Sequence, residues 1–167
     1  ILVPTDFSPN ALKALDFAVQ IAKQTKGEVL IIHASELPDT SFSNENSYEA
    51  DLANKMTLEK KGQLEMLRKT IIETEPVSVT TKFFPGTVAD SILNGADEFQ
   101  ADLIVMGTAG NSGIKEKIFG SKTAAIVGKS NIPVLAIPLL SEWVIPRKIL
   151  VAINNADSDE DVLNPVF

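Results

Sequence analysis

The sequence predicts an α/β fold in which a doubly wound, five-stranded parallel sheet lies between two layers of helices, a three-layer α/β/α arrangement. Short apolar runs alternate along the chain with longer segments of helical periodicity, as in domains built from βα units. The run at residues 29–34 is dense in Ile and Leu, which is typical of a strand buried on both faces. The predicted strands are residues 1–3, 29–34, 77–84 (an edge strand), 103–105 and 133–137.

The first helix has clear start and stop signals. Ser8 is expected to be its N-cap and Pro9 its first residue, since Ser favours the cap and Pro the first helical position. Gly27 is expected to close the helix in the usual C-terminal position. Apolar residues recur at helical spacing in between, namely Leu12, Leu15, Val19 and Ala22.

Three more helices complete the expected order. Residues 37–48 are polar and predict a loop, and a long amphipathic helix follows it. The inner face of that helix is expected to contain Leu52, Met56, Leu64, Leu67 and Ile71. After a turn at residues 85–86, the next helix is expected to bury Val88, Ile92, Ala96 and Phe99. A short last helix is predicted over residues 121–129.

Composition excludes several function classes. The formal net charge of −7 argues against a nucleic-acid surface, which needs a basic footprint, but permits a nucleotide in a local electropositive pocket. The chain has no Cys and a single His, His33, so neither disulfides nor a transition-metal site is expected. No apolar run reaches the length of a membrane span and no signal peptide is evident, so we expect a cytoplasmic protein.

The end of the chain predicts a second, incomplete repeat. Residues 1–138 form the expected domain, residues 139–148 a linker, and residues 149–167 the start of another copy. With a shift of 148 positions, residues 149–151 repeat the Ile-Leu-Val of residues 1–3, and Leu163 falls on Leu15. Asn154 then matches Asp6, so the second copy would bind ligand differently. The alternative is an unrelated C-terminal strand and tail. Because the chain begins inside an apolar run and not with Met, a few residues are expected to precede it.

The most informative motif follows the fourth predicted strand. Gly107 and Gly110 are separated by two residues, and nine further residues separate Gly110 from Gly120–Ser121. Glycine lets a backbone approach a bulky ligand, and a helix that starts after such a loop offers free N–H groups to an anion. The motif therefore predicts a phosphate site.

Topology predicts what faces this motif. In a doubly wound sheet, ligands lie at the carboxyl ends of the strands where the winding reverses. If the first and fourth strands are neighbours there, residues 4–8 face residues 107–110 across a crevice. A nucleotide in that crevice would meet a carboxylate from Asp6 on one side and glycine amides on the other.

These segments resemble the universal stress protein family over residues 1–138. The resemblance is carried by Val-Pro-Thr-Asp-Phe-Ser at residues 3–8, Leu-Ile-Ile-His-Ala at 30–34, Ala-Asp-Leu-Ile-Val-Met-Gly-Thr at 101–108 and Ile-Pro-Val-Leu at 132–135. It implies a Rossmann-like, adenine nucleotide alpha hydrolase-like fold, and the glycine pattern is similar to that of the ATP-binding members. The resemblance also implies dimerisation through the last strand, with a homodimer or a second domain of the same family as the partner.

The resemblance implies roles for individual residues. Gly107 and Gly110 would line the phosphate and ribose path, Ser121 would cap the phosphates, and Asp6 would lie by the nucleoside. The complete set of candidate binding residues is Pro4, Thr5, Asp6, Met106, Gly107, Thr108, Gly110, Gly120, Ser121 and Lys122. Mg²⁺ can accompany the phosphates, since it keeps several waters and takes few protein ligands. No protein metal ligand and no catalytic residue is assigned.

Each candidate also has a purely structural interpretation. Asp6 could organise the first turn of a helix, and the glycines could serve only a tight strand-to-helix turn. Gly120–Ser121 could be an ordinary capped helix start. His33 is more often a packed or hydrogen-bonded core residue than a catalyst. The lysines that flank the motif could neutralise phosphate or simply be solvated; these are Lys115, Lys117 and Lys122.

Three functions remain open from the sequence. The first is a binding module that holds ATP and acts in stress response through ligand occupancy and dimerisation. The second is an interaction module with an empty crevice, which pairs through the edge of the last strand. The third is an enzyme, either a slow ATPase or an adenylyl- or phosphoryl-transferase; the chain lacks a Walker A sequence and is therefore not a P-loop enzyme.

Overall fold

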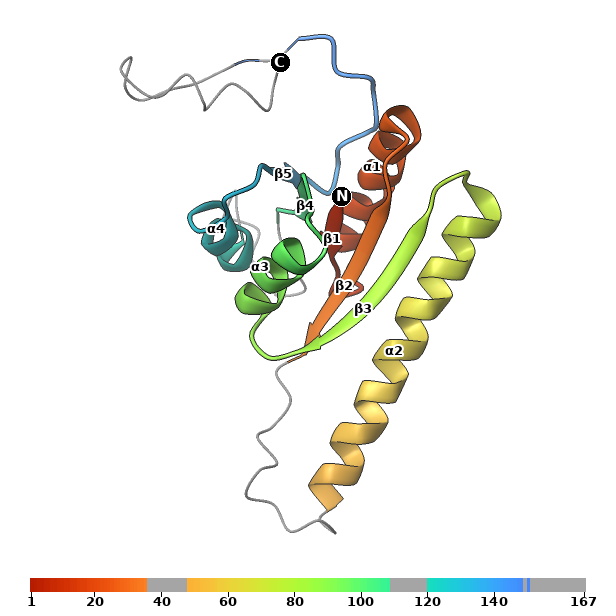
Figure 1. Cartoon of the computed structure of the whole chain (residues 1–167), viewed down its shortest axis with the longest axis vertical. Helices are drawn as coiled ribbons and strands as arrows, with labels where there is room; N and C mark the ends of the chain where they lie inside the picture. Colours follow the sequence, from red (N-terminus) through yellow and green to blue (C-terminus); the bar gives the residue numbers. More distant parts are fainter. Residues whose placement is uncertain (36–47, 109–119, 149, 151–167) are drawn as a thin grey trace.

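The computed structural model of the chain describes residues 1–35, 48–108, 120–148 and 150. Strands and helices alternate through these ranges (Figure 1). Their order is β1 (Leu2–Pro4), α1 (Pro9–Thr25), β2 (Val29–Ser35), α2 (Tyr48–Thr74), β3 (Val79–Pro85), α3 (Val88–Glu98), β4 (Ile104–Gly107), α4 (Ser121–Val127) and β5 (Val134–Ile137). Each predicted strand is present, with its ends displaced by at most two residues.

The five strands form one parallel sheet in the order β3-β2-β1-β4-β5. Leu2 pairs with Leu30 of β2 on one side and with Ile104 of β4 on the other. The chain therefore winds outward from β1 in both directions, and the winding reverses between β1 and β4. This confirms the doubly wound parallel sheet and the adjacency of the first and fourth strands.

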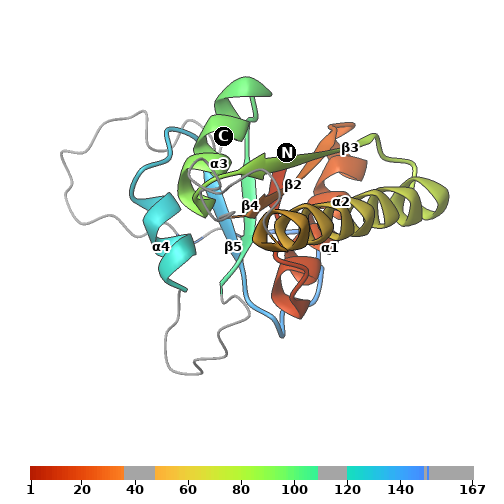
Figure 2. The ribbon, with the colours of Figure 1, turned by 90° about the horizontal axis from the view of Figure 1, so that it is seen from below.

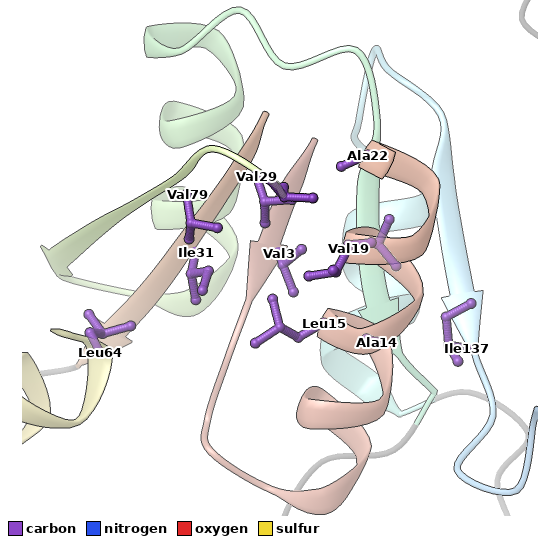
Figure 3. Packing of buried hydrophobic residues seen from close by; sticks show 13 residues of the cluster. Val3, Ala14, Leu15, Val19, Ala22, Val29, Ile31, Leu64, Val79 and Ile137 are labelled. Carbon is purple, nitrogen blue, oxygen red and sulfur yellow. The ribbon is translucent and has the colours of Figure 1, made fainter. Parts of the chain in front are cut away.

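Alternate strand residues pack into two cores, because successive side chains point to opposite faces of a sheet. One face packs against α1 and α2, as Figure 3 shows for Leu15, Val19 and Leu64. The strand residues of this core are Val3, Val29, Ile31, Val79, Val105 and Ile137. The opposite core consists of Leu2, Leu30, Ile32, Ile104 and Met106 from the strands and Ile92, Ala96 and Ile126 from α3 and α4. Figure 2 shows the sheet from below, with α1 and α2 on one side of it and α3 and α4 on the other.

Helix α1 begins as the sequence predicts and ends one residue differently. Ser8 is the N-cap, its side chain accepts a hydrogen bond from the Ala11 N–H at 3.3 Å, and Pro9 is the first helical residue. At the other end Lys26, and not Gly27, takes the left-handed conformation, with φ of 57°. The amides of Lys26 and Gly27 both donate to the Ala22 carbonyl, and Thr25 is the last residue of the helix.

Helix α2 packs only through its second half. Leu64 is buried, and Leu67 and Ile71 pack against the same core. The expected burial of Leu52 and Met56 is wrong, since 46% and 54% of these side chains are exposed. Figure 1 shows why: the first turns of α2 extend past the ends of β2 and β3, where the sheet no longer lies beneath them.

Phe99 is a second exception to the expected core. Val88, Ile92 and Ala96 pack against the core as predicted, but Phe99 follows the end of α3 and is 42% exposed. Its ring lies under the Lys82 ammonium, 5.0 Å from the ring centroid. The helical periodicity therefore stops one residue before Phe99.

Several predictions concern residues outside the described ranges. These are the loop after residue 36 up to Tyr48, Gly110, Lys115 and Lys117, and the proposed second repeat apart from Leu150. The predicted linker is described, and Trp143 in it packs edge-on against Phe17 of α1 at 5.3 Å between ring centroids. Within the ranges that the structure describes, no helix is long and apolar enough to span a bilayer.

Candidate functional site

The loop between β1 and α1 is closed by its own hydrogen bonds. The Thr5 amide donates to the Ile32 carbonyl at 2.8 Å and extends the ladder beyond the end of β1. The Phe7 amide donates to the Thr5 hydroxyl at 3.0 Å, and the Ser8 amide to Asp6 Oδ1 at 3.0 Å. Phe7 itself takes a left-handed conformation with φ of 62°. These internal hydrogen bonds give the loop a defined shape at the carboxyl end of β1.

Asp6 has a structural role in this loop. Its hydrogen bond to the Ser8 amide forms an Asx turn, which leads the chain into α1. This bond supports the alternative interpretation of Asp6, in which its side chain organises the start of the helix. A carboxylate offers about four lone-pair sites, so this bond is compatible with a ligand contact at the same side chain.

His33 lies beneath the same loop. Its side chain is buried, and Nδ1 lies 2.7 Å from the Thr5 carbonyl oxygen. A carbonyl can only accept a hydrogen bond, so Nδ1 carries the proton and donates. Burial lowers the pKa of His33, opposed by the bond to Thr5 and modified by Lys60, Asp6 and Lys122. The interpretation of His33 as a hydrogen-bonded core residue is confirmed.

Two aromatic rings enclose the His33 imidazole. The Phe7 ring lies 4.9 Å from it and the Phe83 ring 5.8 Å, between centroids. The Lys60 ammonium of α2 lies 5.0 Å from the centroid of the Phe7 ring. The loop, β2 and β3 thus meet at this imidazole, and α2 reaches the Phe7 ring through Lys60.

Gly107 ends β4 at a close contact with α1. A Cβ atom at this position would lie 2.8 Å from the Asn10 carbonyl oxygen and 2.9 Å from its carbon. Both atoms belong to the backbone, which cannot move aside as a flexible side chain would. The close approach of the two backbones therefore requires glycine, which supports the structural interpretation of this residue independently of a ligand.

Hydrogen bonds hold Thr108, just after β4, and Gly120, just before α4, close together. The Gly120 amide donates to the Thr108 carbonyl, and the Thr108 amide donates to the Ile137 carbonyl of β5 at 3.0 Å. The two ends of the predicted phosphate loop therefore meet beside β4. Gly120 is the N-cap of α4 and Ser121 its first residue, so Ser121 is not the N-cap that the alternative interpretation supposed.

The remaining candidates differ in their accessibility. Pro4 ends β1 and is half-buried, whereas the Met106 side chain is buried in the core with α3 and α4. Lys122, in the first turn of α4, is exposed. Gly110 lies outside the described residues.

Thr123 was missed by the sequence reasoning. Its hydroxyl donates to the Gly107 carbonyl at 2.9 Å, and its side chain is only 3% exposed. This bond attaches the first turn of α4 to the end of β4. The available signal was a Thr three residues before the apolar Ile126, which places both on one helix face.

The site as a whole is built where the winding reverses. The first turn of α1 and the end of β4 are in contact through Asn10 and Gly107, and Thr123 in the first turn of α4 bonds to the Gly107 carbonyl. Among the residues that the structure describes, no group of three His, Asp or Glu side chains could hold a metal ion. The candidate groups in this region are main-chain amides, the Asp6 carboxylate at the start of α1 and the Lys122 ammonium in the first turn of α4.

Comparison with known proteins gives one consistent result. A model of the universal stress protein family matches residues 1–138. Universal stress protein MJ0531 of Methanocaldococcus jannaschii is 34% identical over 140 residues, which cover 82% of this chain and 80% of that protein. The solved structure of MJ0577, from the same organism, superposes with a TM-score of 0.71 at 30% identity and covers 82% of this chain and 93% of that one.

Two further solved structures contain adenine nucleotides. A universal stress protein in complex with cAMP superposes with a TM-score of 0.60 at 25% identity, covering 83% of this chain and 94% of that one. A universal stress protein from Archaeoglobus fulgidus in complex with dAMP gives a TM-score of 0.58 at 25% identity, covering 81% and 94%. The family match spans the whole sheet described above. The chain therefore belongs to the universal stress protein family.

Proposed function

We propose that this protein binds an adenine nucleotide, ATP in particular, at the carboxyl ends of β1 and β4. The observation that carries the proposal is the adjacency of β1 and β4 where the winding of the sheet reverses, with the first turn of α1 packed against Gly107 at the end of β4. In open α/β sheets, ligands bind at this topological position. The complexes of two relatives with cAMP and dAMP support an adenine nucleotide as the ligand class.

Each part of the site would meet a different part of the ligand. The Asp6 carboxylate would lie by the nucleoside, and the Gly107 backbone would pass close to the phosphate path. The first turn of α4, from Ser121 onward, would supply main-chain N–H groups to the phosphates. The exposed Lys122 would offset phosphate charge, and Mg²⁺ would reach the phosphates largely through water. Occupancy of the site would be the signal that the protein conveys.

Calorimetry on the purified protein tests this proposal. Titration with Mg·ATP should give saturable heat, and Asp6→Ala should weaken binding by about tenfold, the effect of losing one hydrogen bond to a charged group. Asp16→Ala is the matched control, because Asp16 is an exposed carboxylate on α1 and its loss changes the net charge equally. Absence of saturable heat at millimolar Mg·ATP would contradict the proposal, as would equal affinities of the two variants.

A second candidate function is association through β5. This strand is one edge of the sheet, and Leu135 within it is 37% exposed. An edge strand presents unpaired N–H and C=O groups that can pair with another chain. Exposed apolar residues continue into the linker at Leu140 and Val144. We propose a second copy of this domain as the partner, either another chain or the repeat suggested for residues 149–167.

Sedimentation distinguishes this candidate from ligand binding. Leu135→Lys should shift a dimer to monomer, whereas Leu58→Lys should not, since Leu58 is a 73% exposed residue of α2, away from that edge. The Asp6→Ala variant should sediment like the unmodified protein. A monomer at high concentration in the unmodified protein would rule out self-association through β5.

A further inference from the structure

The imidazole of His33 contacts the residues on both sides of Asp6. Its Nδ1 donates to the Thr5 carbonyl at 2.7 Å, and its ring packs on the Phe7 ring at 4.9 Å between centroids. The carboxylate proposed to meet the nucleoside thus belongs to the one residue between these two contacts. His33 itself is 28 positions away in sequence from Thr5, at the carboxyl end of β2.

The hydrogen bond to Thr5 sets the plane of the next peptide. A peptide unit is planar, so a fixed Thr5 carbonyl fixes the direction of the Asp6 N–H as well. The described residues contain no cis peptide bond, and in a trans peptide the N–H points opposite to the carbonyl. The Asp6 amide therefore points away from His33. The other polar atoms of Thr5 are also held, since its amide donates to Ile32 and its hydroxyl accepts from Phe7.

The orientation of the His33 ring is itself restricted. Phe7 and Phe83 pack against it at 4.9 and 5.8 Å, and the side chain is only 8% exposed. Buried side chains in such packing occupy single rotamers. The Nδ1–H donor is therefore held in place by β2, by Phe83 of β3 and by Phe7 of the loop. Its hydrogen bond in turn holds the Thr5 carbonyl of the loop.

We propose that His33 is a positioning residue of the nucleotide site, which sets the Thr5–Asp6 peptide and thereby presents the Asp6 carboxylate to the ligand. This inference rests on the proposed nucleotide function. His33 need not touch the nucleotide; it acts through the loop. A preformed loop pays less ordering entropy on binding, which appears directly as affinity.

Two substitutions separate the donor from the ring. His33→Phe keeps an aromatic ring between Phe7 and Phe83 but removes the N–H. His33→Asn removes the ring but keeps an N–H donor at the same number of bonds from the backbone as Nδ1. We expect His33→Phe to raise the Kd for Mg·ATP about fivefold, the equivalent of one ordinary hydrogen bond. His33→Asn should stay within about twofold of the unmodified protein, although it unfolds at lower temperature.

A double-substitution cycle tests whether His33 acts through Asp6. If it does, His33→Phe should change the Kd by less than about twofold when Asp6 is already Ala. A merely structural role would lower the unfolding temperature and leave the Kd ratio the same in both backgrounds. Where His33→Phe does not fold at the assay temperature, His33→Leu takes its place, since it also lacks the donor.

The results distinguish failure of the proposed nucleotide site from failure of the positioning role of His33. Lack of Mg·ATP binding by the unmodified protein would reject the proposed function itself. Three results would overturn the positioning role and leave the nucleotide site standing. The Kd for Mg·ATP could be unaffected by His33→Phe, or His33→Asn could raise it as much as His33→Phe does. The effects of His33→Phe and Asp6→Ala on binding could also be additive. Weakening by His33→Phe alone, lost in the Asp6→Ala background, would support it.

Discussion

Substitution of Gly107 by Ala is expected to destabilise the protein through the backbone of Asn10. The added Cβ would lie 2.8 Å from the Asn10 carbonyl oxygen, whereas ordinary contacts begin at 3.4 Å. The end of β4 and the first turn of α1 would have to separate by about 0.6 Å, and overpacking of this kind costs about 1–3 kcal/mol. In a protein of this size that corresponds to a fall in Tm of about 2–12 °C.

Thermal unfolding by circular dichroism, with Gly62→Ala as the matched control, measures this effect. Gly62 lies on the exposed side of α2, and a Cβ there would meet nothing within 4 Å. Since Ala favours a helix over Gly by about 1 kcal/mol, Gly62→Ala should raise the Tm by about 2–4 °C. The two Gly→Ala changes should therefore have opposite signs. A Gly107→Ala protein as stable as the unmodified one would refute the packing argument and leave a ligand as the reason for this glycine.

Three other changes test the fold and the environment of His33. Ser8→Ala removes the cap of α1 and should cost about 1 kcal/mol in urea denaturation, whereas an unchanged midpoint would contradict the capping bond. Ile92→Val in the fully buried core should cost about 1 kcal/mol, and the same change at the 42% exposed Ile72 should stay within about 0.5 kcal/mol; equal effects would contradict the assignment of the core. Because burial lowers the pKa of His33 below the ordinary 6.5, the unfolded chain binds the proton more tightly. Stability is then complete above that pH and decreases as the pH falls below it. Urea titrations at pH 7.5 and about 5.5 should show a smaller difference in His33→Phe than in the unmodified protein, and equal differences would refute the burial argument.

Patterns among residues close together in the sequence predicted the helices and strands well. Ser8 and Pro9 begin α1 because cap chemistry depends on a few adjacent residues, and apolar runs marked all five strands. Two expectations failed for a common reason. Helical spacing shows which face of a helix is apolar, but not whether anything packs against that face. It could not show that the turns of α2 that carry Leu52 and Met56 extend beyond the sheet.

The candidate site was predictable in its location and not in its internal contacts. The family motifs and the reversal of winding predict it between β1 and β4, and the strand order confirms that these two strands are neighbours. The approach of Gly107 to Asn10 and the bond from His33 to Thr5 join residues far apart in sequence. No spacing rule contains such contacts, since they depend on how β2 and α1 pack around the loop.

Titration of the isotope-labelled protein with Mg·ATP, followed by backbone NMR, tests the central claim most directly. Binding at the proposed site should shift the amide signals of Asp6, Phe7, Thr108, Gly120 and Lys122 along one saturable curve. Shifts that are absent at millimolar Mg·ATP, or that are confined to the linker or to the exposed turns of α2, would contradict a nucleotide site between β1 and β4.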